Sequence, residues 1–204
     1  MDGTLVDSRA LHWRSWREAL AAEGVAVTEA QFRATFGQRN DRILQAWLGE
    51  EATPERIRRV GDAKEESYRR LVAAEGTSPL PGAAEWVRRL GASGWRQAIA
   101  SSAPRLNVEV VLEVIGLARE FAAIVSAEDV RHGKPDPEVF LTAAERLGVP
   151  AARCIVVEDA EHGIEAARRG GMRAVGVGGV RSDVSVASLA ELALDAFDRL
   201  VVNT

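Results

Sequence analysis

The amino-acid sequence predicts an α/β fold: a doubly wound parallel sheet into which a block of helices is inserted. From residue 83 onward, helical segments alternate with short apolar runs, which is typical of βαβ units. Between residues 11 and 74 the pattern is helical throughout. We therefore expect an α/β core made of residues 1–8 and 79–204, and a helical domain made of residues 9–78.

Four helices are expected in the inserted block. The first has apolar residues at near-helical spacing from Leu11 to Leu20 and ends about Gly24. The fourth begins at Pro54, which suits an early helical position after Thr53. The second, third and fourth cover residues 29–35, 41–48 and 54–74. Residues 78–82 contain two prolines and a glycine, so they form a turn or hinge.

The remainder alternates between helix and strand. Helices are expected at residues 83–90, 104–115, 137–147 and 163–169, and strands at 97–100, 123–126, 154–157 and 174–177. Residues 188–202 give only a weak signal for either state. Because ligands of parallel sheets bind at the carboxyl ends of the strands, the residues that follow each strand are the candidates for function.

Composition limits the partners. A net charge of −4 offers no electrostatic footprint for nucleic acid. Cys154 is the single cysteine and cannot form an intrachain disulfide, and no apolar run approaches the ~20 residues needed to cross a bilayer. No signal peptide is apparent. We expect a cytoplasmic protein, a monomer or weak homo-oligomer, with neither nucleic acid nor membrane as partner.

Two strand ends carry groups suited to phosphate. Ser101 and Ser102 follow the first strand, and a hydroxyl with free N–H groups at a helix start can hold a phosphate oxygen. An ordinary N-cap is the alternative. Lys134 is fixed between a glycine and two prolines, where a point cation suits phosphate charge. A solvated surface lysine is the alternative.

A third strand ends in two adjacent carboxylates, Glu158 and Asp159. Carboxylate oxygens are hard ligands of the kind that Mg²⁺ prefers, together with water and substrate phosphate. The alternative is a solvated turn with Asp159 near a helix start. Taken together, however, the strand-end residues predict a site for a metal and a phosphate group.

These motifs, with Asp2-Gly3-Thr4 at the front of the chain, resemble in order and spacing the four motifs of the haloacid dehalogenase superfamily. The resemblance covers essentially the whole chain. It implies a Rossmann-like core and Mg²⁺-dependent phosphoryl transfer through an aspartyl phosphate. The expected reaction is hydrolysis of a small phosphate monoester, such as a sugar phosphate. A haloalkanoic acid dehalogenase is less favoured, because loss of halide needs no acid in the place of Asp2.

The resemblance also implies roles for single residues. Asp2 would be the general acid/base, with its main-chain carbonyl on Mg²⁺. Asp159 would bind the metal and Glu158 would bind or orient it. Ser101 and Lys134 would grip the phosphoryl group, which could also be faced by backbone N–H groups of Gly3, Thr4 and Ser102.

In this family the nucleophilic aspartate stands two residues before the Asp of Asp-Gly-Thr, which here falls one position before Met1. The sequence thus resembles such an enzyme without its first strand. We expect that the functional protein starts upstream, with Met1 as the middle residue of an Asp-Met-Asp triplet. The chain alone should then be poorly stable and show little or no phosphotransfer. The alternative is a non-catalytic protein that binds phosphorylated metabolites.

The helical block resembles the cap of one branch of the superfamily, and residues around His12 look most like β-phosphoglucomutase and related sugar-phosphate phosphatases. That likeness places His12 beside the acid/base aspartate and Lys64 at the sugar phosphate. His12 could equally be an ordinary, partly buried helix residue.

Asn40 stands where the mutase has an arginine for the second phosphate, although Arg39 or Arg42 could substitute. The departure favours a monophosphate phosphatase, with a β-phosphoglucomutase-type phosphohexose mutase as the alternative. We interpret the tryptophans of the block as core residues rather than as a platform for sugar.

Overall fold

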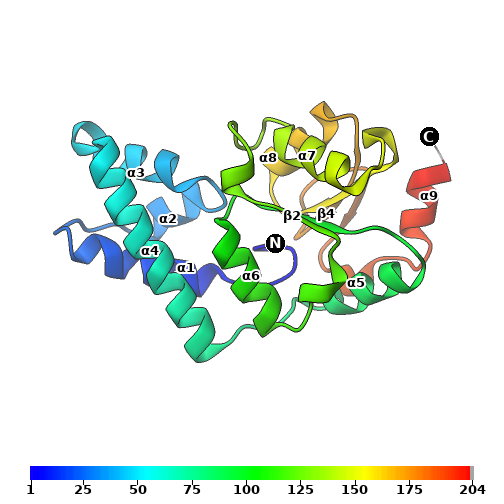
Figure 1. Cartoon of the computed structure of the whole chain (residues 1–204), viewed down its shortest axis with the longest axis horizontal. Helices are drawn as coiled ribbons and strands as arrows, with labels where there is room; N and C mark the ends of the chain where they lie inside the picture. The colour runs from blue at the N-terminus through cyan, green and yellow to red at the C-terminus, as the bar shows by residue number, and fades with distance from the viewer. Residues whose placement is uncertain (203–204) are drawn as a thin grey trace.

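The computed structural model describes residues 1–202, and in it the helices of the inserted block lie to one side of the strands (Figure 1). This block contains α1 (Arg9–Ala21), α2 (Glu29–Thr35), α3 (Asn40–Leu48) and α4 (Pro54–Glu75). All four predicted helices are confirmed within a few residues. Two of them begin where the sequence places a cap: the side chains of Thr28 and Thr53 accept hydrogen bonds from the first turns of α2 and α4.

A small apolar core holds these helices together. It includes Trp16, Phe32, Leu44 and Val60, all of which are buried. Trp13 and Trp47 pack against this core from its edge. The interpretation as a core residue is therefore confirmed for Trp16, although its side chain also lines the pocket described below, whereas Trp13 and Trp47 are half-buried.

The remaining elements form the α/β region, and every strand predicted there is present. In chain order they are α5 (Ala83–Ala92), β1 (Ala98–Ala100), α6 (Arg105–Val114), β2 (Ala123–Val125), α7 (Glu138–Leu147), β3 (Ile155–Glu158), α8 (Glu161–Arg169), β4 (Arg173–Val177), β5 (Val184–Val186) and α9 (Ala196–Val202). Strand β5 was not expected. Its three residues are too short for an alternating pattern to stand out. The weak signal at residues 188–202 resolves into a short 3₁₀ turn and α9.

All strand pairings are parallel, as expected, but the strands form two sheets. In one, β1 pairs with β2 (Ala98 beside Ala123); in the other, β4 lies between β3 and β5 (Ile155 beside Arg173). Strands β1 and β3 thus each have one edge that no named strand of the described residues covers.

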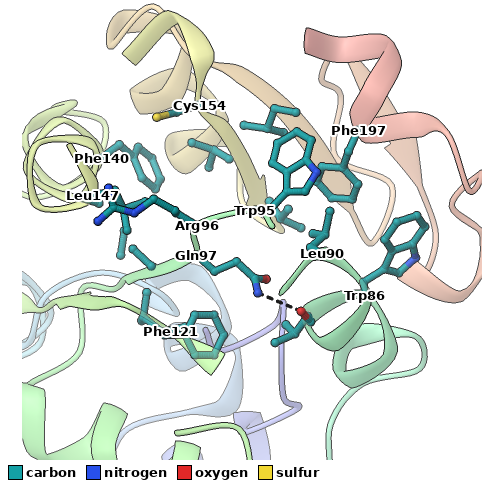
Figure 2. Close-up of a pocket in the computed structure, with 18 of the residues that line it drawn as sticks. Trp86, Leu90, Trp95, Arg96, Gln97, Phe121, Phe140, Leu147, Cys154 and Phe197 are labelled. Atoms are coloured by element: carbon teal, nitrogen blue, oxygen red, sulfur yellow. Dashed lines mark hydrogen bonds between the residues drawn. The ribbon is translucent and has the colours of Figure 1, made fainter. Parts of the chain in front are cut away.

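An apolar cavity of about 520 Å³ separates the two sheets. It is lined by both uncovered strands, β1 and β3, and by Met1 and Leu5 from the front of the chain. Figure 2 shows Trp95, Phe121 and Phe140 around this space, on segments from different parts of the α/β region.

The inserted block is attached to the α/β region by apolar packing of α4 on α6. Tyr68 and Leu71 of α4 share one buried cluster with Val108 and Val111 of α6. This packing places the block over the edge of the sheet at which β1 ends. The expected domain boundaries at residues 8/9 and 78/79 stay a prediction. Within residues 1–202, every helix is too short or too polar to cross a membrane.

Candidate active site

One pocket gathers most of the predicted site residues. It has a volume of about 100 Å³ and lies between the inserted block and the carboxyl ends of β1 and β3. Its lining includes Asp2, His12, Lys64, Ser101, Ser102, Lys134, Glu158 and Asp159. Residues that are far apart in the sequence are therefore brought to one place, as expected for the end of a parallel sheet.

The front of the chain forms a tight loop around the backbone of Gly3. The N–H of Gly3 donates to the carbonyl of Val6 at 2.8 Å, and that of Leu5 to the carbonyl of Met1 at 2.7 Å. Gly3 has a φ of +73°, and a Cβ there would lie 1.9 Å from Oδ2 of Asp159. Only glycine therefore allows this close approach. The hydroxyl of Thr4 donates to Oδ1 of Asp159 at 3.2 Å, which joins the first motif to the last.

The carboxylate of Asp2 is held by three side chains. Ser8 donates to its Oδ1 at 2.5 Å and the hydroxyl of Tyr68 lies 3.4 Å from the same atom. Nε2 of His12 is 3.5 Å away. Burial alone would raise the pKa of Asp2, but contact with His12, the charge of the Met1 amino group and the hydrogen bond from Ser8 outweigh it and hold the pKa well below its usual range. Asp2 is therefore an oriented carboxylate rather than a frayed terminal residue.

The position of His12 fits both interpretations of the sequence, a helix residue that is buried and a residue that lies beside Asp2. It is a buried residue of α1, and its ring stacks on Tyr68 with a centroid distance of 3.9 Å. It also faces Asp2. Burial, and then the positive charge of Lys64, lower its pKa. His12 is therefore neutral at pH 7 and suited to donate a hydrogen bond to Asp2.

Lys134 and Glu158 form a buried ion pair, with Nζ 2.7 Å from Oε2. Burial would raise the pKa of Glu158, but the charge of Lys134 outweighs it and lowers the pKa. The other oxygen of Glu158 accepts the N–H groups of Asp159 and Ala160 at 3.2 and 3.3 Å. A Cβ at Gly163 would lie 2.2 Å from the Glu158 carboxyl carbon, so a glycine is required there.

The pKa of Asp159 is shifted in the opposite direction to that of Glu158. Burial, and then the adjacent Glu158 carboxylate, raise its pKa. An additional positive charge beside these two carboxylates would lower the pKa of Asp159, because it would offset both the burial and the negative charge of Glu158. The donor set of two carboxylates and a nearby main-chain carbonyl, that of Asp2, has the hard oxygen chemistry that fits Mg²⁺.

Ser101 lies buried directly after β1. Its N–H continues the sheet by donating to Val125 at 2.9 Å, and its hydroxyl accepts from the N–H of Ala103 at 3.1 Å. Pro104 occupies the N-cap position of α6, so neither Ser101 nor Ser102 is the helix cap that was the alternative. Both serines line the pocket.

Three of the predicted site residues, Gly3, Thr4 and Arg39, do not line this pocket, and Arg39 is turned away from it. Its guanidinium points to the loop after β2, where Nη1 donates to the carbonyls of Ala127 and Val130 at 3.2 and 3.4 Å. Arg42 is exposed on α3. Asn40 does line the pocket, and it donates to Glu65 at 2.6 Å.

Sequence reasoning missed three polar residues that contact the predicted ones, Ser8, Glu65 and Tyr68, and a fourth, Asn107, that contacts Glu65. Tyr68 follows Lys64 by one helical turn, and that spacing could have indicated that both face the site. Ser8 follows the Asp2-Gly3-Thr4 motif by four positions and was given no role. Glu65 and Asn107 gave no signal, because their contact joins α4 to α6 across 42 positions.

The comparisons with known proteins agree with this geometry. Residues 1–171 match the family described as haloacid dehalogenase-like hydrolases. The chain is 33% identical over 180 residues to fructose-1-phosphate phosphatase YqaB of Escherichia coli K12, which covers 87% of this chain and 93% of that protein. It is 31% identical over 208 residues to hexitol phosphatase B of the same organism, covering 94% and 91%.

Solved structures show the same fold. CbbY from Rhodobacter sphaeroides, crystallised with phosphate, has a TM-score of 0.89 at 27% identity and covers 97% of this chain and 96% of its own. β-Phosphoglucomutase from Clostridium difficile has a TM-score of 0.88 at 24% identity, covering 99% and 94%.

The chain therefore belongs to the haloacid dehalogenase-like hydrolases. Within that family it is an enzyme of the phosphatase and phosphomutase class, as the sequence predicted.

Proposed function

We propose that this protein hydrolyses a small phosphate monoester, such as a sugar phosphate, with Mg²⁺ and through an aspartyl phosphate. The observation that carries the proposal is the meeting of Asp2, Ser101, Lys134 and Asp159 around one pocket beneath the inserted helices. A carboxyl acid, a hydroxyl, a buried cation and a metal-binding carboxylate are the groups that displacement of a phosphate ester needs.

Asp159, Glu158 and the main-chain carbonyl of Asp2 would hold Mg²⁺, which supplies positive charge to offset the phosphate oxygens. Lys134 and Ser101 would bind the phosphoryl group, together with the backbone N–H of Ser102. The N–H groups of Gly3 and Thr4 donate to the carbonyls of Val6 and Met1 at 2.8 and 3.2 Å, so they would face the phosphate only after this loop rearranges. The ion pair between Lys134 and Glu158 keeps the lysine at the pocket before substrate arrives.

Asp2 would carry the proton to the leaving oxygen. Its pKa is low while His12 and Ser8 hold it, so it is ionised in the free protein. A phosphate dianion beside it would raise that pKa, because like charge disfavours the carboxylate. Proton uptake by Asp2 would therefore accompany substrate binding.

The inserted helices would act as a cap. A volume of about 100 Å³ is smaller than the ~300 Å³ or more of a typical small-molecule site. The cap would therefore move to admit the substrate and then close to exclude water. His12 and Lys64 would contact the acid/base residue and the substrate from this side.

We place the nucleophile immediately before Met1, on a strand that fills the apolar cavity. Met1 and Glu158 line both the apolar cavity and the polar pocket, so a residue preceding Met1 lies where the two meet. Burial has the largest effect on the pKa values of Asp2, Glu158 and Asp159, but the positive charge of the Met1 amino group also acts on all three. This position is thus close to the metal-binding carboxylates.

The test extends the chain upstream by an apolar strand of about six residues that ends in aspartate; we call this the extended protein. It should release phosphate from sugar phosphates when Mg²⁺ is present, and the same extension ending in asparagine should not. Chelation of Mg²⁺ should abolish the activity. A folded extended protein that releases no phosphate from a broad panel of phosphate esters would refute the proposal.

Mutase activity is the second candidate, and the arrangement of the cap favours hydrolysis over it. Asn40 rather than an arginine lines the pocket, and Arg39 is turned toward Ala127 and Val130. Two relatives named above are phosphatases of sugar or hexitol phosphates. Conversion of a hexose 1-phosphate to the 6-phosphate in the presence of the bisphosphate, faster than phosphate release, would reverse this preference.

A non-catalytic role is the remaining alternative. Such a protein would bind phosphorylated metabolites without turnover, even as the extended protein. For partners, we propose a small phosphorylated metabolite alone, with no nucleic acid or membrane, and a cytoplasmic monomer or weak homo-oligomer. Size-exclusion chromatography with light scattering tests the oligomeric state directly.

A further inference from the structure

Glu65 is a buried acid on the side of the pocket that the inserted block forms. It lies on α4, is 6% exposed and lines the pocket. Its Oε1 accepts hydrogen bonds from Asn40 at 2.6 Å and from Lys64 at 2.9 Å. Its Oε2 accepts one from Asn107 at 2.5 Å. Three different helices therefore fix the orientation of this carboxylate.

Asn107 makes this arrangement rigid from the side of the α/β region. It is fully buried on α6, and its carbonyl oxygen accepts a hydrogen bond from Arg69 at 3.0 Å. Its amide group is thereby held with the nitrogen toward Glu65. The position of Glu65 is thus set independently of any ligand.

Glu65 also cancels the charge of Lys64. The lysine is buried between the rings of Trp16 and Tyr68, with Nζ 5.2 and 5.3 Å from the ring centroids. Among the described residues round this pocket, Lys64 is the lysine that the inserted block contributes, and its ammonium is already paired. The block therefore presents little net positive charge to a leaving group.

The carboxylate retains capacity for one more hydrogen bond. A carboxylate has about four acceptor sites, and three of those on Glu65 are used, which leaves one on Oε2. A hydroxyl of the substrate can donate to that site. A carboxylate or a second phosphate cannot, and it would meet a buried like charge.

We infer that Glu65 determines specificity by selecting neutral, hydroxyl-rich leaving groups, such as those of sugar or sugar-alcohol monophosphates, and by rejecting leaving groups that carry a second anionic group. The inference rests on the proposed function and names its substrate class. Rejection by a placed like charge is a common route to specificity.

The experiment compares two esters that differ at one carbon. Sorbitol 6-phosphate ends in a hydroxymethyl group, whereas 6-phosphogluconate ends in a carboxylate. Calorimetric titration of residues 1–204 with Mg²⁺ should give a Kd at least about tenfold lower for sorbitol 6-phosphate, because a like-charge contact of this kind costs more than ~1.4 kcal/mol. Glu65→Gln should shift the ratio of the two Kd values toward 6-phosphogluconate by about tenfold.

Two further variants separate specificity from folding. Glu65→Asp keeps the charge and should keep the preference. Gln38→Glu adds a negative charge on an exposed residue that lines the same pocket, and it should widen the preference. If Glu65→Gln does not fold, Gln38→Glu still decides, since an unchanged ratio there overturns the inference.

The ratio of kcat/KM values for the two esters in the extended protein gives an independent reading. Hydrolysis of both esters with a ratio that Glu65→Gln leaves unchanged overturns the role of Glu65 but not the proposed function. A ratio of Kd values that shifts as expected, without hydrolysis by the extended protein, overturns the proposed reaction alone. Binding of neither ester to the folded chain overturns the inference.

Discussion

The Nε2 atom of His12 lies 3.5 Å from Oδ1 of Asp2, so a residue of the inserted block directly contacts the first motif of the α/β region. His12 is neutral because burial lowers its pKa, and Asp2 is ionised because its partners lower its pKa below the usual range. The contact therefore joins one neutral and one negative group. Movement of the helices away from the sheet would break this contact and alter the acidity of Asp2.

The first prediction concerns Asp2 itself. In the extended protein, Asp2→Asn should lower kcat by about 100- to 10,000-fold, because the leaving oxygen loses its proton donor. KM should change much less. Asp7→Asn is the matched control, since Asp7 is exposed in the same loop and should tolerate the change within about twofold. Equal losses in the two variants would contradict the role of Asp2.

A second prediction concerns the metal site and needs no activity. Burial and Glu158 raise the pKa of Asp159, so its ionised form destabilises the metal-free protein at pH 7. Asp159→Asn should raise the free energy of unfolding without metal by about 1 kcal/mol. It should also abolish the rise in Tm that Mg²⁺ produces in the unmodified chain. Glu161→Gln, an exposed change at the start of α8, should affect neither quantity; a stabilisation by Mg²⁺ that survives Asp159→Asn would place the metal elsewhere.

The third prediction is a dependence of stability on pH that arises at a residue outside the lining of the pocket. Asp129 accepts hydrogen bonds from Arg146 at 2.6 Å, from Arg105 at 2.7 Å and from the Ser126 hydroxyl at 2.7 Å. The bond from Arg146 is the largest cause that lowers its pKa. Since the folded-state pKa lies below the unfolded value of about 4, the stabilisation is complete above that pH and is lost as the pH falls through the folded-state pKa.

Asp129→Asn should therefore cost about 2 kcal/mol at pH 7 and should flatten the loss of stability in acid. Denaturant unfolding between pH 2 and pH 7 measures both effects. Glu109→Gln, on the exposed face of α6, should leave the acid limb of the curve unchanged. An acid limb that keeps its slope in Asp129→Asn would contradict the assignment.

A fourth prediction compares two glycines with the same backbone conformation. Gly82 and Gly94 have φ values of +80° and +81°, but a Cβ at Gly82 would lie 2.3 Å from the backbone nitrogen of Ala190, whereas nothing lies within 4 Å at Gly94. Gly94→Ala should cost about 1–2 kcal/mol through strain alone. Gly82→Ala should cost roughly 1–3 kcal/mol more, because the close approach of two backbones must open. If thermal unfolding showed similar losses of stability for the two variants, the backbone near Ala190 would be able to move away at little cost in free energy, contrary to this prediction.

Most of the fold could be predicted from local pattern. The starts of α2 and α4 follow from Thr28, Thr53 and Pro54, whose effects act within one turn of helix. Ser101 and Glu158 could be placed because they follow apolar runs directly. Strand β5 could not be predicted from three residues, since its pairing with β4 rather than its own pattern defines it.

The features that the sequence did not predict depend on contacts between segments that are distant in the chain. The orientation of Arg39 depends on carbonyls of residues 127 and 130, and nothing near position 39 indicates them. Likewise, Glu65 is fixed by Asn107 on another helix. Such contacts arise only after the helices pack, so a local pattern carries no information about them.

The apolar cavity between the two sheets makes the free energy of unfolding of this chain depend on any peptide in solution that can fill the cavity. A peptide that occupied it would bind the native chain and not the unfolded one, and would raise the free energy of unfolding by RT ln(1 + [peptide]/Kd). At a peptide concentration of 100 times Kd this amounts to about 2.7 kcal/mol. If the peptide ended in aspartate next to Met1, the same titration would switch on phosphate release, and the midpoints of the two curves would report a single Kd.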